Sequence, residues 1–229
     1  RQYSFQARKK FTWGSLIATT SRQDWDLDPA TTDLDLSPFP AASSRVAQSE
    51  GTWTQELRFE SVPGPGKAQW RAGLFYVDSE IDGDAVRQFI VPPSVFVPPG
   101  FVQTERSVFA IGQENLAAYA NLDHPLTEQS TIELGARVER VESNLRRDKA
   151  SSNNYGFPVP PDPTLRMAES HDYVSFSTGL VHGLSDSLSL QGRVSLANKP
   201  AGHSGFTGNP ALARFECEQS WSNEIGFTF

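Results

Sequence analysis

Apolar and polar residues alternate with a period of two along most of this sequence. In residues 130–140, the apolar side is made by Ile132, Leu134, Ala136 and Val138. The intervening positions include Glu133, Arg137 and Glu139. Successive side chains of a strand point to opposite faces, so this alternation predicts strands with one apolar and one polar face. It predicts about nine strands, over residues 1–11, 15–26, 52–62, 68–79, 113–124, 130–143, 170–182, 187–198 and 219–229.

The connections between these strands alternate in predicted length. The short ones contain Gly, Pro, Asp and Ser, which favour turns, and lie at 11–14, 63–67, 124–129 and 183–186. The long ones are rich in Pro, Ser, Gly and Asn and lie at 27–51, 81–112, 147–169 and 199–218. Loops this long are uncommon in ordinary domains, whereas outer-membrane barrels combine short periplasmic turns with long extracellular loops. The sequence therefore predicts an all-β fold, an antiparallel up-and-down transmembrane β-barrel.

The apolar face of the predicted strands fits contact with lipid. From Ile132 to Val138 this face carries no charge, a span of about 23 Å at about 3.3 Å per residue, close to the ~25 Å apolar band of such barrels. The alternation also fits a soluble β-sandwich, which buries one face and solvates the other. The alternation of short and long connections favours the barrel. Seven residues are therefore expected to face lipid: Leu116, Ala118, Ile132, Leu134, Val138, Leu190 and Val194.

Charge and cysteine content narrow the classes of partner. The 229 residues have a formal net charge of −7, and basic residues are interspersed among acidic ones. Because phosphate binding needs clustered Lys and Arg, we expect no nucleic-acid partner. No apolar run approaches the ~18 residues of a membrane-spanning helix. The single cysteine, Cys217, excludes a disulfide within this chain and is interpreted as an isolated loop thiol.

Four strand and hairpin pieces of the chain carry a family resemblance. They are Gln55–Phe59 with Trp70–Tyr76, Tyr119–Asp123 with Leu134–Val138, Phe176–Leu180 with Ser187–Leu190, and Trp221–Gly226. In this order they resemble the barrel of TonB-dependent outer-membrane receptors. The resemblance implies that residues 1–229 are a partial region of a barrel of about 22 strands whose plug domain lies outside this chain. We therefore expect an open sheet whose first and last strands lack partners, with the molecule continuing on both sides.

The same resemblance implies a function in import rather than catalysis. A receptor of this family sits in the outer membrane of a Gram-negative bacterium and binds a scarce ligand, such as an iron–siderophore complex. The expected partners are outer-membrane lipid, the TonB–ExbB–ExbD complex acting through the plug, and a metal-chelate or other small nutrient ligand; no cofactor is expected. Two alternatives remain open: a small passive or adhesive outer-membrane barrel, and a soluble β-sandwich binding module.

Few residues suggest catalytic or metal chemistry. The four histidines, His124, His171, His182 and His203, are too far apart for metal-ligand spacing. His203–Ser204 lacks the strand–turn–helix elbow of a catalytic nucleophile. The acidic stretch 24–35 lacks the Gly and bidentate Glu of a calcium loop and is interpreted as a solvated loop. No catalytic or metal site is therefore predicted.

Aromatic residues and one histidine are the remaining candidates for function. Pro92–Pro93 and Pro98–Pro99 break any strand in 81–112. The candidate ligand contacts in predicted extracellular loops are Phe96, Phe101, Tyr155 and His203. The candidates for aromatic girdles at the membrane interfaces are Trp13, Trp53, Trp70 and Tyr76. Ordinary loop and β-packing roles fit the same residues.

Overall fold

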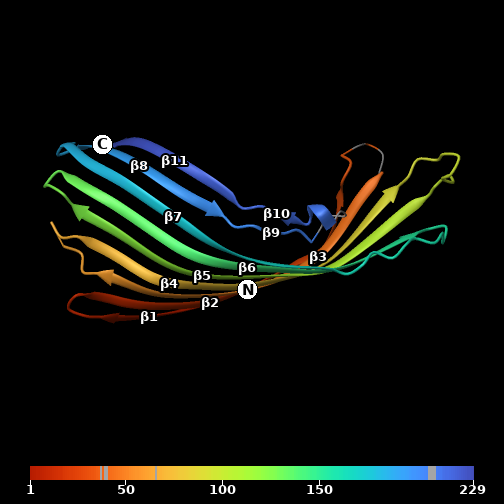
Figure 1. The fold of residues 1–229 in the computed structure, drawn as a ribbon, viewed down its shortest axis with the longest axis horizontal. Coiled ribbons are helices and arrows are strands. Elements are labelled where there is room, and N and C mark those ends of the chain that lie inside the picture. The colour runs from red at the N-terminus through yellow and green to blue at the C-terminus, as the bar shows by residue number, and fades with distance from the viewer. Residues whose placement is uncertain (37, 39–40, 65, 206–209) are drawn as a thin grey trace.

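A single curved layer of long strands makes up most of the molecule (Figure 1). The computed structural model describes residues 1–36, 38, 41–64, 66–205 and 210–229. One antiparallel sheet has the order β1-β2-β3-β4-β5-β6-β7-β8-β11. Its strands are β1 (Gln2–Lys10), β2 (Gly14–Asp33), β3 (Ala42–Ser61), β4 (Gln69–Ile90), β5 (Val102–Pro125), β6 (Ser130–Asn153), β7 (Leu165–Ser185), β8 (Leu188–Lys199) and β11 (Glu218–Thr228). The expected all-β antiparallel meander is therefore confirmed.

The nine-stranded sheet is open, as the sequence predicts. β1 pairs with β2 and β11 pairs with β8. Within the described residues no ladder joins β1 to β11, and the two strands lie at opposite edges of the sheet in Figure 1. Among these residues no helix is long and apolar enough to cross a membrane.

The strands extend much further toward the long connections than the alternation predicted. The predicted loops 27–51, 81–112 and 147–169 are wrong, because the strands continue and leave only 34–41, 91–101 and 154–164 as connections. The acidic stretch 24–35 accordingly lies largely in β2. In these extensions polar residues occupy both faces, so the period-two contrast disappears although the backbone ladder continues.

Turns at the other end of the sheet are short, as predicted. They lie at 11–13, 62–68, 126–129 and 186–187. In one of them the amides of Leu126 and Thr127 both donate to the carbonyl of Ser130. By analogy with barrels, we call this the periplasmic end and the other the extracellular end. The predicted strand-breaking prolines of 81–112 fall in the connection 91–101.

A small second layer forms where the predicted loop 199–218 turns back over the sheet. It contains β9 (Gly202–His203), the 3₁₀ turn η1 (Pro210–Leu212) and β10 (Arg214–Phe215). β9 and β10 pair with each other and not with the large sheet. We call this second layer, residues 201–205 and 210–215, the ribbon. Ala213 of the ribbon joins Ala85, Phe109 and Leu145 in a buried apolar cluster, so the core of this one-layer fold lies beneath the ribbon.

Candidate functional site

One face of the sheet carries a continuous apolar surface. Paired residues of neighbouring strands share a face, and Leu74 pairs with Ala118, Ala118 with Val138, and Val138 with Val174. The row on the periplasmic side, Ala72, Ala120, Ala136 and Phe176, is also apolar. Leu74, Val138 and Val174 remain 53–58% exposed. A soluble monomer rarely exposes so large an apolar patch. We call this surface the apolar belt, and it includes Leu57, Trp70, Ala72, Leu122, Ala136, Phe176, Leu196 and Ile225.

All seven residues expected to face lipid lie in this belt. Leu116, Ala118, Ile132, Leu134 and Val138 share the face by the pairing of β5 with β6. The pairing of β7 with β6 and β8 brings Leu190 and Val194 onto the same face. Two leucines are substantially exposed, Leu116 at 59% and Leu134 at 41%. The sheet thus gathers residues that are far apart in sequence onto one surface.

Charged and aromatic residues bound the belt on its two sides. Toward the extracellular end, the next residues on the same face are charged in five strands, namely Arg22, Asp78, Glu114, Arg140 and Asp172. At the periplasmic end, Trp13 stacks on Phe59 at 6.4 Å and on Trp70 at 6.2 Å between ring centroids.

Aromatic residues also mark the extracellular boundary of the belt. Trp53 pairs with Asp78, and the Tyr76 hydroxyl donates to Glu114 at 3.4 Å. The four girdle candidates therefore lie at the two edges of the belt, where membrane barrels carry aromatic girdles.

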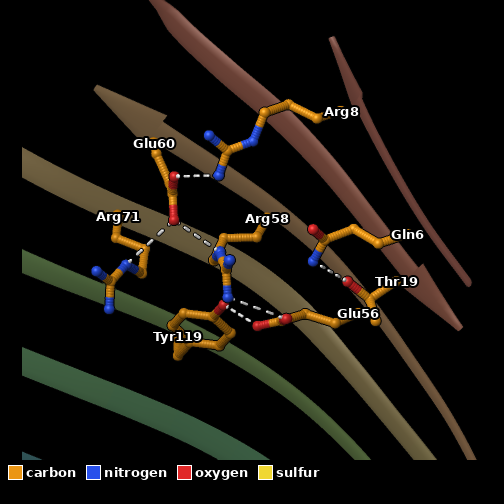
Figure 2. Close-up of polar contacts among 8 residues, drawn as sticks. All are labelled: Gln6, Arg8, Thr19, Glu56, Arg58, Glu60, Arg71 and Tyr119. Carbon is orange, nitrogen blue, oxygen red and sulfur yellow. Dashed lines mark hydrogen bonds and ion pairs between the residues drawn. The ribbon is translucent and has the colours of Figure 1, made fainter. Parts of the chain in front are cut away.

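The opposite face, which we call the inner wall, carries a polar network near the periplasmic end (Figure 2). Arg58 contacts Glu56 at 3.2 Å and Glu60 at 2.9 Å. Glu60 also lies 3.6 Å from both Arg8 and Arg71. These residues come from β1, β3 and β4. Two carboxylates and three guanidinium groups from three strands are therefore held on one face of the sheet.

A glycine allows the inner-wall network to reach a fourth strand. Tyr119 of β5 crosses β4 above Gly73 and donates its hydroxyl hydrogen to Glu56 of β3. A Cβ on Gly73 would lie 2.8 Å from the Tyr119 ring, so any larger residue would push the ring away. Because Gly73 has no side chain, Tyr119 can cross β4 and connect β5 to the network.

Further along the inner wall, polar side chains hold the ribbon. His203 of β9 is buried, and its Nδ1 lies 2.9 Å from Ser143 Oγ of β6. Its Nε2 lies 3.5 Å from Glu169 of β7, which also forms an ion pair with Arg214 of β10 at 2.9 Å. The backbone amide of Ala201 donates to the Tyr173 hydroxyl at 2.9 Å. His203, expected in an extracellular loop, therefore lies on the side of the ribbon that contacts the wall.

The Ser143–His203–Glu169 arrangement is structural rather than catalytic. Ser143 is 5% exposed and lies under the ribbon, so its hydroxyl has no access to a substrate. A nucleophilic serine needs room for the reacting carbonyl beside it. No group of three His, Cys, Asp or Glu side chains in the described part of the chain could hold a metal ion.

The tips of two extracellular connections are joined by aromatic stacking. Phe101 stacks on Tyr155 at 6.1 Å and on Phe157 at 6.2 Å between centroids. Tyr155 donates its hydroxyl hydrogen to the Pro99 carbonyl at 2.7 Å, and Asn154 bonds Gly100 and Val102. We call these three rings the aromatic tip. Tyr155 and Phe157 stay about half exposed, and Phe96 nearby in sequence is 93% exposed.

The match of this chain to a known protein family shows which kind of protein carries these features. The model of the family described as TonB dependent receptor-like, beta-barrel, matches residues 1–229. This chain belongs to the TonB-dependent receptor family. These receptors are outer-membrane β-barrel proteins of Gram-negative bacteria, so the belt, the inner wall and the extracellular end belong to a protein of that membrane.

Solved structures of TonB-dependent receptors share the fold of this chain. The ferric yersiniabactin uptake receptor FyuA from Yersinia pestis superposes with a TM-score of 0.76 at 18% identity, over 99% of this chain and 32% of its own. The siderophore receptor PiuA from Acinetobacter baumannii gives 0.68 at 12% identity, over 99% and 37%. The ferric citrate transporter FecA gives 0.57 at 14% identity, over 99% and 31%. This chain therefore spans about a third of the length of these receptors, and no curated protein matches it.

Sequence reasoning found some of these receptor features and missed others. Of the candidate ligand contacts, the structure brings Phe101 and Tyr155 together, leaves Phe96 on the tip of 91–101, and buries His203. The inner-wall network was missed, although Glu56, Arg58 and Glu60 alternate on one side of β3. The sequence signal for this network is a run of opposite charges, two residues apart, on the polar face of a predicted strand.

Proposed function

We propose that this chain is part of the barrel wall of a receptor that actively imports a scarce ligand across the outer membrane. The observation that carries the proposal is the division of the sheet into an apolar belt and a charged inner wall. The belt matches the height of a membrane's hydrocarbon, and the inner wall offers polar groups to a lumen. The seven belt residues expected to face lipid then contact the hydrocarbon directly.

The inner wall would contact a plug domain. We treat residues 1–229 as one barrel region, with the plug and further strands supplied by the rest of the molecule. Glu56, Arg58 and Glu60 are only 21–25% exposed yet face the lumen, where their remaining hydrogen-bonding capacity suits a polar partner. The TonB–ExbB–ExbD complex would act on the barrel through that plug, which couples transport to inner-membrane energy.

The proposed cargo is a metal chelate such as an iron–siderophore complex. FyuA and PiuA, which share the fold, are named as a ferric yersiniabactin receptor and a siderophore receptor. In this chain the aromatic tip offers half-exposed rings at the extracellular end. Aromatic faces bind flat apolar or cationic groups with little loss of side-chain entropy. Phe101 and Tyr155 are therefore the proposed ligand contacts, and Phe96 is a secondary one.

Uptake in whole cells tests the proposal. A strain lacking this receptor should lose uptake of its ferric chelate under iron limitation, and restoring the intact gene should restore uptake only when TonB is present. Uptake that persists without TonB would instead indicate a passive barrel. A receptor that restores attachment to surfaces but no uptake would indicate the adhesive alternative.

A pair of variants tests the role of the aromatic tip. Tyr155→Ala removes one ring of the stack and its bond to Pro99, so we expect chelate binding to weaken by about tenfold, the loss of one good aromatic contact. Val95→Ala is the matched control, because Val95 is 95% exposed and outside the stack. Equal affinities for the two variants would exclude the aromatic tip as a ligand contact.

A further inference from the structure

The face of the sheet that carries the apolar belt also carries two polar side chains next to its extracellular boundary. Thr20 of β2 pairs with Gln55 of β3, and Gln55 pairs with Tyr76 of β4. Two residues away from Gln55 along β3, Leu57 lies in the belt on one side and Trp53 lies at the aromatic boundary on the other. With the belt in the membrane, these polar groups lie at the edge of the hydrocarbon.

Neither polar side chain has a hydrogen-bond partner in the part of the chain that the structure describes. The Thr20 hydroxyl oxygen is buried and unpaired. Gln55 is exposed, and its carboxamide makes no hydrogen bond to a described residue. Hydrocarbon supplies no water to replace these bonds, so an unpaired carboxamide there is strongly unfavourable. A lipid that brings its own polar group to this level would satisfy it.

An apolar groove of about 610 Å³ lies beside these two side chains, which both line it. Leu57 and Leu74 line the groove toward the middle of the belt, and Trp53 lines it at the boundary. Two of the lining side chains are largely open to the outside, Phe5 at 67% and Leu74 at 53% exposed. The groove thus combines an apolar surface for a hydrocarbon chain with polar groups near the level where such a chain joins its headgroup.

The hydrogen-bonding capacity of Gln55 indicates which kind of acyl chain fits. A carboxamide has two N–H donors and a carbonyl acceptor. An ester linkage only accepts, so an ordinary phospholipid leaves the Gln55 oxygen unpaired. An amide linkage or a hydroxyl group on the chain both donates and accepts, so it satisfies both sides of the carboxamide. The glycolipid in the outer leaflet of Gram-negative outer membranes has amide-linked chains with hydroxyl groups close to the sugar.

We propose that the groove binds one acyl chain of the outer-leaflet glycolipid, with the amide or hydroxyl group of that chain hydrogen-bonded to Gln55. Rotation of Thr20 about χ1 to another staggered position would turn its hydroxyl toward the chain as a second partner. The hydrocarbon part of the chain packs on Leu57 and Leu74. The inference rests on the proposed contact between the belt and lipid, and it adds one specific lipid to that contact.

Native mass spectrometry of the intact receptor tests the proposal. The receptor is extracted in mild detergent, stripped of lipid and mixed with lipid A, or with phosphatidylethanolamine as the ester-linked comparison. Gln55→Leu together with Thr20→Val removes the two polar groups with little change in volume. We expect this double variant to bind lipid A about tenfold more weakly, the effect of losing two hydrogen bonds. Binding of phosphatidylethanolamine should change much less.

A hydroxyl on the other face provides the matched control. Thr54 pairs with Ser21 and Val77 on the inner wall, so Thr54→Val leaves the groove intact and should bind lipid A as the native receptor does. Equal lipid A affinity in the native receptor and the double variant overturns the proposal. So does a double variant that loses lipid A and phosphatidylethanolamine equally, because the groove would then not distinguish the amide-linked chain.

A stability measurement on the same variants separates this proposal from the orientation of the belt. In phospholipid bilayers without glycolipid, the double variant should resist denaturant better than the native receptor, because two unpaired polar groups have left the hydrocarbon. Adding lipid A should raise the denaturation midpoint of the native receptor and of Thr54→Val but not that of the double variant. If lipid A raises all three midpoints equally, the groove is not a glycolipid site, although the belt faces lipid. If the double substitution has no effect in phospholipid either, the belt does not face lipid and both proposals fail.

Discussion

Leu134 and Glu133 are neighbours in the chain but meet different surroundings. Leu134 lies in the apolar belt, whereas Glu133 accepts a hydrogen bond from Arg193 on the inner wall. The two residues face different environments only because successive side chains of a strand point to opposite faces of the sheet. The sequence predicted the belt residues for this reason. It could not place His203, because its surroundings depend on Ser143 and Glu169, which other strands supply.

Replacing Leu134 tests the assignment of the belt at a single position. Leu134→Arg puts a charge near the middle of the four apolar positions of β6, so it should destabilise the membrane-inserted receptor by about 2–4 kcal/mol. The matched control is Ser195→Arg, since Ser195 pairs with Ser177 and Ser222 on the inner wall. Denaturant unfolding of the intact receptor in lipid vesicles measures both, and similar costs for the two would contradict the assignment.

Arg58 allows a test of the inner-wall network. Arg58→Met leaves the carboxylates of Glu56 and Glu60 without their shared guanidinium, so it should cost about 1–3 kcal/mol. Adding Glu60→Gln should recover part of this loss, which would appear as coupling in a double-mutant cycle. The control is Arg140→Met, whose pair with Glu142 is 57–58% exposed on the outer face and should matter by less than about 1 kcal/mol. Strict additivity would show that the network has no cooperative role.

At the scale of elements, the strand segments that contribute to the apolar belt were predictable from their alternation. The strand extensions beyond the belt lack this alternation and were not predicted. β6 was predicted as 130–143 but runs to Asn153. Beyond Arg140 the outer face is polar, and the buried inner face mixes Leu145 with Ser143 and Arg147, so the apolar–polar alternation that marks the belt ends there. The ribbon was missed for a related reason. Its apolar contact with the wall joins Ala213 of the ribbon to Phe109 and Leu145 of the wall, which are distant in sequence and show no local period.

Gly83 in β4 allows a test of how the apolar cluster beneath the ribbon is packed. A Cβ on Gly83 would lie 2.1 Å from Phe109 Cζ, so Gly83→Ala must displace the ring and should cost about 1–3 kcal/mol in the extracellular extension. Hydrogen exchange of β4 and β5 should then accelerate beyond Ser79, whereas the belt segment of these strands stays protected. Gly192→Ala is the control, since nothing lies within 4 Å of its Cβ position. Equal protection in the two variants would show that Phe109 adapts freely.

At the scale of the whole molecule, the open sheet with two unlike faces fits a segment of a barrel that is larger than this chain. β1 and β11 each have one paired edge, and an unpaired edge in hydrocarbon costs several kcal/mol per unsatisfied group. The sequence predicted this openness from the strand count and the family resemblance. The cargo was not predictable, because the proposed cargo contacts, Phe101 and Tyr155, lie at loop tips that no periodic pattern brings together.

The central claim is that the two faces of the sheet meet lipid and lumen. The most direct measurement is a spin-label scan of positions 132–139 of β6, one cysteine at a time, in the intact Cys217→Ser receptor in lipid bilayers. Labels at Ile132, Leu134, Ala136 and Val138 should be relaxed mainly by oxygen, which concentrates in lipid. Labels at Glu133, Gly135, Arg137 and Glu139 should show low oxygen accessibility, because they face the lumen. Equal accessibility at the two parities, or the reverse pattern, would contradict the account.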